Sequence, residues 1–243
     1  RFANGSVFYS DLSSAPLVGL TSTLVVYLLA LAFYQRVGQA PWANPVLWSI
    51  VGLGAVLLIS GVPYPSYFAG AQFIHFLLGP AVVALGVPLW ERRTTLASSW
   101  GRFLVAGLIG GTAAAASAVL LGWAVGLPGD LLRSLAPKSV TAPVAMGVAQ
   151  SIGGVPALAA VFAVLTGLVG ALSGRALFRL MGMSESRLDW MARGFAMGTS
   201  AHGLGAARAL QVNADAGAYA GLALGLQVLL GSLIIPLVAH WFF

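Results

Sequence analysis

Long hydrophobic runs separated by short charged segments dominate the pattern along the chain. Five stretches contain no Asp, Glu, Lys or Arg: residues 12–35, 37–90, 103–129, 139–174 and 216–243. A membrane-spanning helix needs roughly 20 apolar residues, so each run is long enough for at least one span. No segment shows the ~10-residue alternation of polarity that is typical of membrane β-barrels. The pattern therefore predicts an all-α polytopic membrane protein.

Prolines and glycines divide the longer runs into shorter helices. The sequence GVPYPSY at 61–67 interrupts the second run and predicts one span near 44–62 and another near 67–90. GGVP at 153–156 splits a run that is too short for two full spans, which predicts one half-length helix and one full helix. Including these, we expect about seven or eight hydrophobic segments, some of them interrupted or re-entrant. The remaining predicted helices cover residues 12–35, 102–126, 141–152, 156–176 and 216–243.

The ends of the runs carry the information on orientation. Arg36 and two clusters, Arg92/Arg93/Arg102 and Arg175/Arg179/Arg187/Arg193, mark the predicted cytoplasmic side. Arg36 and both clusters lie on the same side if the segment 141–152 dips into the membrane and returns. The N-terminus is then outside. The first run lacks the basic lead of a signal peptide, so we interpret it as a true span. Because the chain opens at Arg1 without a Met, we expect residues upstream of it in the native protein.

A weak internal symmetry relates two parts of what we take as a single domain, residues 1–243. NPVLWSIVG at 44–52 resembles APVAMGVAQ at 142–150, and LLGPAVVALG at 77–86 corresponds in position to AMGTSAHGLG at 196–205. In the predicted orientation, the members of each pair begin on opposite faces of the membrane, as an inverted repeat requires. The predicted repeat halves are 37–127 and 130–243; chance similarity is the alternative.

Composition and motifs narrow the class of protein further. Hydrophobic residues make up 59% of the chain and charged residues 7%, against roughly 25% charged in a soluble domain. The net charge of +6 comes from basic residues at span ends, which favours lipid headgroups over nucleic acid as their partner. The chain has no cysteine, and it contains no HExxH, P-loop or nucleophile elbow. We therefore predict no enzymatic activity, no metal site and no cofactor.

Three helix breaks carry the candidate chemistry: Gly79-Pro80, Thr141-Ala142-Pro143 and Gly198-Thr199-Ser200. Broken backbone is tolerated at membrane depth only where it is buried in protein or lines a water-filled cavity. The start of a half-helix presents partial positive charge, which suits a small anion. All six acidic residues lie in or near predicted loops, which argues against a carboxylate proton relay and against a cation channel.

The candidate substrate-binding residues fall into three groups. Lys138, His202 and Arg208 would supply positive charge, and hydroxyl groups would donate hydrogen bonds from Ser139, Thr141, Thr199 and Ser200. The other candidates stand at the proline-led starts and breaks: Asn44, Gly79, Pro80, Pro143 and Gly198. Alternatives remain open, because glycines also serve helix packing, Lys138 suits an interfacial anchor, and Arg208 suits a helix cap or a snorkelling side chain.

Three sequence blocks carry a resemblance to a known family. They are YPSYFAGAQFIHFLLGPAVVALGVPLW (64–90), PKSVTAPVAMGVAQSIGGVPALAAVFAVLTGLVGA (137–171) and RGFAMGTSAHGLGAARALQVNADAGAYAGLALGLQVLLGSLIIPL (193–237). Together they cover about half the chain, in family order, and the chain resembles the LrgB/CidB family. One departure is that the family pattern has Ser directly before the His, whereas Ala201 stands there in this chain, and Ala206 replaces a common Thr. Because of this departure, the substrate or its affinity could differ from that of other family members.

The resemblance implies two kinds of function. Bacterial members are described as holin/antiholin-like regulators of murein hydrolase export and cell lysis that act with a small LrgA/CidA-type membrane partner. Plant relatives look like chloroplast-envelope glycolate/glycerate carriers, and some bacterial pairs are linked to pyruvate uptake. The implied location is the bacterial inner membrane, or the plastid envelope if the source is a plant. We also expect a homo-oligomer.

Our first hypothesis is a secondary transporter of small monocarboxylates such as glycolate, glycerate, lactate or pyruvate. The carboxylate would lie between the opposed half-helix starts, and one repeat would move against the other to give alternating access. The alternative is a lysis regulator that acts with an LrgA/CidA-type partner and has no solute site. A third hypothesis, an anion channel, shares the site but predicts flux without saturation or counterflow.

Overall fold

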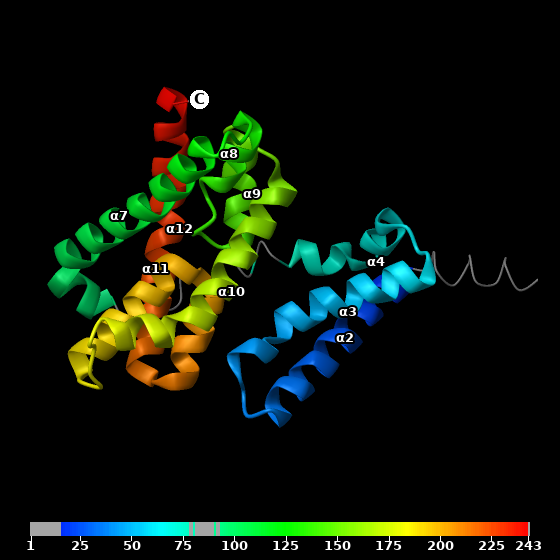
Figure 1. Cartoon of the computed structure of the whole chain (residues 1–243), viewed down its shortest axis with the longest axis horizontal. Helices are drawn as coiled ribbons and strands as arrows, with labels where there is room; N and C mark the ends of the chain where they lie inside the picture. Colours follow the sequence, from blue (N-terminus) through cyan, green and yellow to red (C-terminus); the bar gives the residue numbers. More distant parts are fainter. Residues whose placement is uncertain (1–15, 78–79, 81–89, 91–92, 243) are drawn as a thin grey trace, which may run out of the picture. The chain divides into compact units, whose positions relative to one another are not determined.

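The structure is a computed structural model that describes residues 16–77, 80, 90 and 93–242. In these residues the regular secondary structure is helical, with no β-strand. The chain divides into two compact units, Arg1–Pro80 and Ala81–Phe243. Figure 1 shows the helices of both units, and each unit is described by itself below.

The described part of the first unit, from residue 16 onward, contains three helices joined by short connections. They are α2 (Pro16–Arg36), α3 (Pro45–Ser60) and α4 (Tyr64–Phe76), with a short 3-10 turn, η1 (Pro41–Ala43), between the first two. α2 packs against both other helices. Gly19 allows α2 to approach α4 closely, because a Cβ atom there would lie 3.0 Å from the Ala71 nitrogen. The Thr23 and Tyr67 hydroxyls join the same two helices by a hydrogen bond of 2.7 Å.

Local sequence explains where α3 begins and ends. The Asn44 side-chain oxygen accepts hydrogen bonds from the backbone N–H groups of Val46 and Leu47, and proline occupies the first helical position. Gly61 ends the helix in the left-handed conformation, with φ of +66°. The boundary predicted from GVPYPSY is therefore confirmed.

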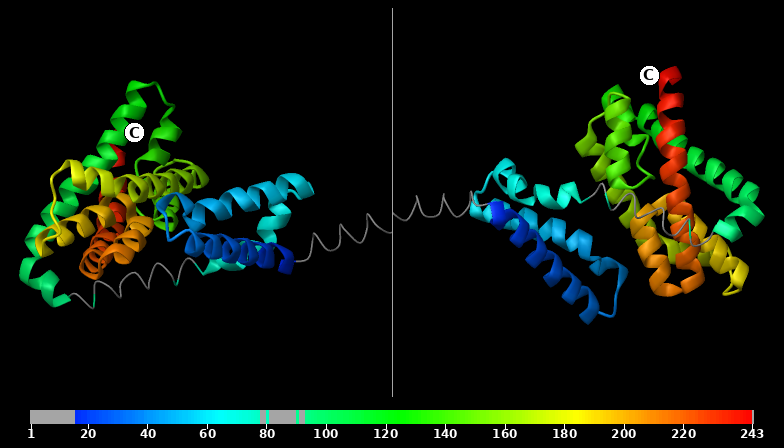
Figure 2. Two further views of the ribbon diagram at one scale, coloured as in Figure 1. Left: turned by 60° about the horizontal axis from the view of Figure 1, so that its bottom comes forward. Right: turned by 180° about the vertical axis from the view of Figure 1, so that it is seen from behind.

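Within residues 93–242, which the structure describes, the second unit contains six helices. α10 packs against α9 and α11, α11 packs along α12, and α12 also contacts α7 and α9. Figure 2 shows α11 and α12, in yellow to red, side by side in both views. The six helices are α7 (Arg93–Ala124), α8 (Gly129–Leu135), α9 (Ala142–Ser151), α10 (Pro156–Leu180), α11 (Arg187–Val212) and α12 (Ala214–Phe242).

Small residues bring α11 and α12 into backbone contact. Gly194 and Gly198 lie four residues apart on α11, and each faces an alanine of α12, Ala216 and Ala220 respectively. A Cβ atom at either glycine would collide with the backbone of the facing alanine. Small residues spaced by four are the usual way in which membrane helices approach closely. α11 and α12 are thus a tightly packed pair.

Four of the described helices are long and apolar enough to cross a membrane: Leu17–Arg36, Trp100–Ala124, Pro156–Leu180 and Ala214–Trp241. They correspond to four of the predicted spans. The half-length helix expected at 141–152 is confirmed as α9, and the split expected at GGVP is confirmed by Gly153, whose φ is +77°. Much of the second half of the predicted span 67–90 lies outside the described residues.

The break predicted at Gly198-Thr199-Ser200 is wrong in its position. These residues are helical, and the interruption lies at His202, where φ is +41° and ψ is −131°. Gly198 is occupied in packing against α12, and the Ser200 hydroxyl donates to the Ala196 carbonyl, a bond typical of a helix interior. Gly198 therefore serves close approach of two helices and not a turn.

Candidate functional site

The connection between α8 and α9 places a lysine beside a buried hydroxyl group. The Ser134 hydroxyl accepts a hydrogen bond of 2.7 Å from the Val155 backbone N–H and thereby ties α8 to the start of α10. The connection then runs back over the unit to the start of α9. Lys138 is half-buried there, and its Nζ donates to the Ser139 Oγ at 3.2 Å. Ser139 itself is only 6% exposed.

Thr141 stands at the N-terminus of α9 with its hydroxyl unused. It is the N-cap residue, but its side chain makes no capping hydrogen bond. Thr141 is 8% exposed, and its Oγ1 has no hydrogen-bond partner among the described residues. A buried hydroxyl without a partner costs roughly 1–3 kcal/mol. Among the described residues, this hydroxyl therefore remains able to donate a hydrogen bond.

The kink in α11 is held by the side chain of His202. The imidazole is 4% exposed, and its Nε2 lies 2.6 Å from the Ala163 carbonyl of α10. Because a carbonyl only accepts, Nε2 carries the proton and Nδ1 is the nitrogen left to bind another. Gly167 makes room for the ring, since a Cβ atom there would lie 2.7 Å from Cε1. A backbone in this sparsely populated region costs about 1–3 kcal/mol, which the surrounding contacts must offset.

Thr199 lies one turn before the kink and also has an unused hydroxyl. It is 5% exposed, and its Oγ1 has no hydrogen-bond partner in the part of the chain that the structure describes. Its methyl group faces Gly110 of α7, where a Cβ atom would lie 3.0 Å away. Two predicted hydroxyl donors, Thr141 and Thr199, thus share the same unusual state.

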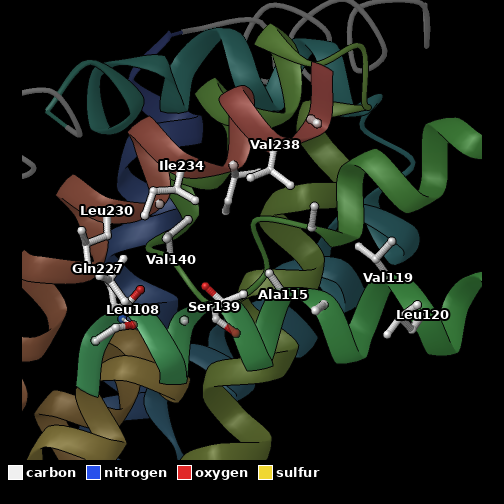
Figure 3. A pocket seen from close by; sticks show the side chains of 18 of the residues that line it. Leu108, Ala115, Val119, Leu120, Ser139, Val140, Gln227, Leu230, Ile234 and Val238 are labelled. Atoms are coloured by element: carbon white, nitrogen blue, oxygen red, sulfur yellow. Dashed lines mark hydrogen bonds between the residues drawn. The ribbon is translucent and has the colours of Figure 1, made fainter. Parts of the chain in front are cut away.

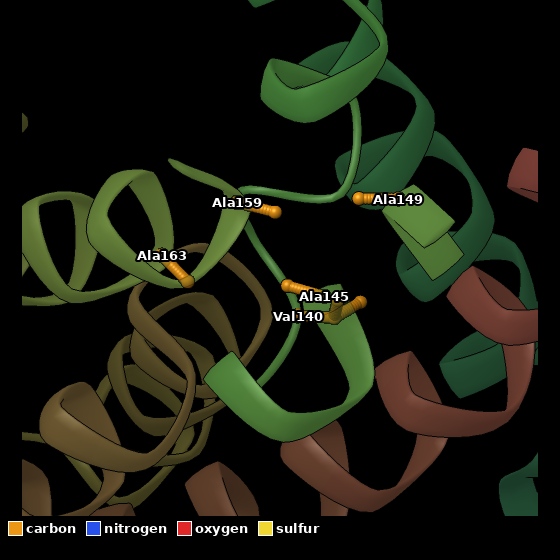
Figure 4. Packing of buried hydrophobic residues seen from close by; sticks show 5 residues of the cluster. All are labelled: Val140, Ala145, Ala149, Ala159 and Ala163. Atoms are coloured by element: carbon orange, nitrogen blue, oxygen red, sulfur yellow. The ribbon is translucent and has the colours of Figure 1, made fainter. Parts of the chain in front are cut away.

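A small alanine-rich core connects the α9 start to the α11 kink. Figure 4 shows its five side chains, which come from α9, α10 and the preceding connection. Ala163 contributes its methyl group to this core, and its carbonyl accepts the hydrogen bond from His202. The core consists of Val140, Ala145, Ala149, Ala159 and Ala163. The two helix interruptions are therefore joined through α10.

Lys138 gives this region its positive charge. It is the single lysine in the sequence, and among the described residues no carboxylate lies within 4.0 Å of it. No group of three or more His, Asp or Glu side chains that could hold a metal occurs in the described ranges. The arrangement suits a small anion.

A cavity of about 560 Å³ lies beside this region, between α7, α12 and the α8–α9 connection. Ser139 and Val140 reach its wall from the connection. Figure 3 shows Ser139 and Ala115 across the cavity from Ile234 and Val238. At one end, the Gln227 side-chain nitrogen donates to the Gly107 carbonyl at 2.7 Å and links α12 to α7.

The other candidates from the sequence lie apart from these groups or have another partner. Ser200 is exposed, and Arg208 donates from Nη1 to the Gln211 side chain at 3.3 Å. Gly198 packs against α12, as described above. Pro143 is half-buried in the first turn of α9, Asn44 caps α3 in the first unit, Pro80 is exposed, and Gly79 lies outside the described residues.

The sequence analysis missed two features of the site. Gly167, which makes room for the imidazole, is one of 31 glycines, and nothing in its neighbourhood distinguishes it. Gln227 interrupts the last apolar run, and a lone amide in such a run was a usable signal. For Lys138, which was among the predicted residues, its being the single lysine of the sequence was a further usable signal.

Comparison with known proteins agrees with the fold and the motifs. YxaC of Bacillus subtilis (strain 168) is 33% identical over 221 residues, which cover 91% of this chain and 94% of the relative. YwbG of the same organism is 34% identical over 214 residues, 88% of this chain and 93% of the relative. "Holin-like protein CidB" of Staphylococcus aureus (strain N315) is 30% identical over 221 residues, with 91% and 94% coverage. No solved structure matches.

The family model described as the LrgB-like family matches residues 23–241. This match covers most of the chain, including both helix interruptions and the cavity. Together with the long apolar helices, it makes the chain a multi-pass membrane protein. The chain belongs to the LrgB-like family.

Proposed function

We propose that the protein is a secondary transporter of small monocarboxylates and that it has no enzymatic activity. One observation carries the proposal: the buried Thr141 and Thr199 hydroxyls lack partners among the described residues, and both stand beside helix interruptions. Unsatisfied buried hydroxyls are retained only where something compensates their cost. A transported carboxylate would accept hydrogen bonds from both and be released in another conformation.

Charge supports a carboxylate over a neutral or cationic substrate. Lys138 supplies the one ammonium group, and it is half-buried with no carboxylate beside it in the described residues. The N-terminus of α9 adds partial positive charge next to Thr141. The remaining nitrogen of His202, Nδ1, would carry a proton if transport is coupled to protons. Lys138 thus binds the carboxylate, the threonines orient it, and His202 holds a proton.

Alternating access would use the two repeat halves 37–127 and 130–243. α3 and α9 are both short helices led by a proline, as the first repeat pair requires. α4 and the kinked α11 are the second pair. In this proposal the short helices complete seven or eight membrane segments, with the basic clusters in the cytoplasm. The location would be the bacterial inner membrane, or the plastid envelope in a plant.

Counterflow in proteoliposomes tests the proposal. Vesicles containing the purified full chain are loaded with unlabelled lactate, glycolate or pyruvate, and the uptake of external labelled substrate is followed. A carrier gives a transient accumulation of label above equilibrium, because the internal substrate returns the carrier in its loaded form. A channel gives equilibration without this overshoot. The Thr141→Val, Thr199→Val double variant should lose the overshoot, whereas Thr21→Val, at an exposed position of α2, should retain it.

A lysis regulator is the second candidate function. It is favoured by the name "Holin-like protein CidB" of relatives that are 30% identical to this chain. This function predicts no uptake of any 2-hydroxy or 2-keto acid, even with an LrgA/CidA-type partner in the same vesicles. It also predicts that substitutions at Thr141 and Thr199 change nothing. Uptake that is restored by the partner would instead indicate a two-component transporter.

A further inference from the structure

The cavity beside Ser139 is larger and more apolar than a three-carbon acid requires. Its volume is about 560 Å³, within the range of roughly 300–1,000 Å³ that accommodates drug-sized ligands. Such a volume is not needed to bind the carboxylate, since the groups proposed for that lie on the α8–α9 connection and the α11 kink. The proposed carboxylate site therefore does not account for the cavity.

The two long walls of the cavity are built from complementary helix faces. The α7 wall combines small residues spaced by four, Gly107, Gly111 and Ala115, with larger ones, among them Leu120 and Trp123. The α12 wall presents larger side chains, among them Leu230, Ile234 and Val238. Side chains of α12 pack on Gly107 and Gly111 at one end, and the larger residues of both helices give the cavity an apolar surface. An alkyl chain is the kind of group that such walls bind.

Polar groups are confined to a few points on the lining. The Gln227 nitrogen is already used by the Gly107 carbonyl. Ser139 is only 6% exposed, and its Oγ accepts a hydrogen bond of 3.2 Å from the Lys138 Nζ. Thr112, on an exposed part of α7, is the third polar residue of the lining. Lys138 is not itself a lining residue, but its Nζ lies 3.2 Å from the Ser139 hydroxyl, which is. An apolar cavity with this hydroxyl in its wall and an ammonium group beside the hydroxyl matches a molecule with one anionic end and one apolar end.

We infer that the cavity binds the alkyl chain of a medium-chain monocarboxylate whose carboxylate lies at Lys138 and Ser139. The inference rests on the proposed function and extends its substrate class from three-carbon acids toward acids of about eight carbons. A phospholipid acyl chain is the competing occupant. The buried Ser139 next to a half-buried lysine suits a carboxylate, whereas a phospholipid would have to bring a bulky headgroup to the same corner.

Chain-length dependence tests the inference. Straight-chain acids from propionate to octanoate are used to inhibit the uptake of labelled lactate into proteoliposomes. Each added methylene should lower the inhibition constant about threefold to fourfold, the usual gain for burying one CH₂ group. In Ala115→Phe the ring fills the cavity, so the gain per methylene should fall at least about twofold. Leu121→Phe, on α7 but outside the lining, is the matched control for partition into the membrane.

Fluorescence gives an independent measurement because Trp123 lines the cavity. Bromine-labelled octanoate should quench the wild-type protein more than Trp123→Phe, and unlabelled octanoate should reverse the difference. Equal chain-length gains in Ala115→Phe and Leu121→Phe would overturn the inference. So would quenching of Trp123 by brominated phospholipid that octanoate does not relieve, since a lipid chain would then be the occupant.

The two proposals fail in different ways. If lactate is transported but inhibition is independent of chain length, the proposed function stands and the cavity inference is wrong. If no acid is transported, the proposed function fails, and the Trp123 quenching still decides whether octanoate occupies the cavity. If bromine-labelled octanoate quenches Trp123 in the wild-type protein but not in Ala115→Phe, the cavity is a binding site for the acid even without transport.

Discussion

The two ends of α12 meet their neighbours in opposite ways. Near its N-terminus, Ala216 and Ala220 touch the backbone of α11 at two glycines. Farther along, the Leu230 and Gln227 side chains of α12 pack on Gly107 and Gly111 of α7, and Ile234 and Val238 line a cavity of about 560 Å³. Both contacts involve glycines on the partner helix, but the α11 glycines meet backbone atoms of α12, whereas the α7 glycines meet side chains of α12. The difference shows that the residue facing a glycine decides how near the two backbones come: alanine lets them touch, whereas leucine and glutamine fill the space with their side chains.

The largest expected effect comes from breaking the close contact. Gly198→Val places a branched side chain against the Ala220 backbone, where even a Cβ atom does not fit. Overpacking of this kind costs typically about 1–3 kcal/mol, and more where backbone must move. We expect loss of the monodisperse peak in size-exclusion chromatography, or a melting temperature at least about 4 °C lower. Ala116→Val on the cavity wall is the control, and equal melting of the two variants would contradict the comparison.

The second effect concerns transport and not stability. Thr141→Val together with Thr199→Val should reduce lactate uptake at least about tenfold, because two charge-assisted hydrogen bonds to the carboxylate are lost. The melting temperature should stay the same or rise, since neither hydroxyl has a partner among the described residues. A structural role would give the reverse result, a lower melting temperature with uptake unchanged.

A smaller effect is expected where the two helices of the cavity are tied together. Gln227→Leu removes the hydrogen bond to the Gly107 carbonyl and should destabilise the protein by about 1 kcal/mol. The melting temperature would fall by roughly 2–4 °C. Gln150→Leu, at an exposed position of α9, serves as the matched control. Identical melting of the two variants would mean that the amide does not hold the cavity end closed.

The smallest effect is a pH dependence at the start of α11. Hydrogen bonds from Ser184 and Ser186 hold the pKa of Asp189 below its ordinary value. The carboxylate therefore contributes stability above its unfolded pKa of about 3.9, and this contribution is lost as the pH falls through the lower folded value. The melting-temperature difference between wild type and Asp189→Asn should be constant above about pH 5 and should shrink below about pH 4. A difference that grows on acidification would reverse the assigned sign.

Helix boundaries were predictable where proline or glycine determines them. Pro45, Gly61, Pro143 and Pro156 each mark a start or an end that the structure contains. The break in α11 was not predictable in the same way. Its glycine at 198 serves packing, while the strained residue is His202, whose conformation depends on a hydrogen bond to Ala163, 39 residues away. The local sequence around His202 does not indicate such a distant contact.

The candidate site was predicted in part. Lys138, Ser139, Thr141, Thr199 and His202 lie at or beside the two interruptions, joined through α10. Ser200 and Arg208 follow the same helix but present their polar groups elsewhere, because the kink falls after residue 200. The cavity could not be predicted, since it depends on how far α7 and α12 diverge. Hydrophobic patterning gives no information on that distance.

The central claim, that a carboxylate binds at Lys138, is tested most directly by amine labelling. Lys138 is the single lysine, so peptide mass spectrometry separates its labelling from that of the N-terminal amine. We predict that lactate at about ten times its Kd slows labelling of Lys138 about tenfold, whereas neutral lactamide does not. A labelling rate that is the same with and without saturating lactate, in protein that transports lactate, would contradict the account.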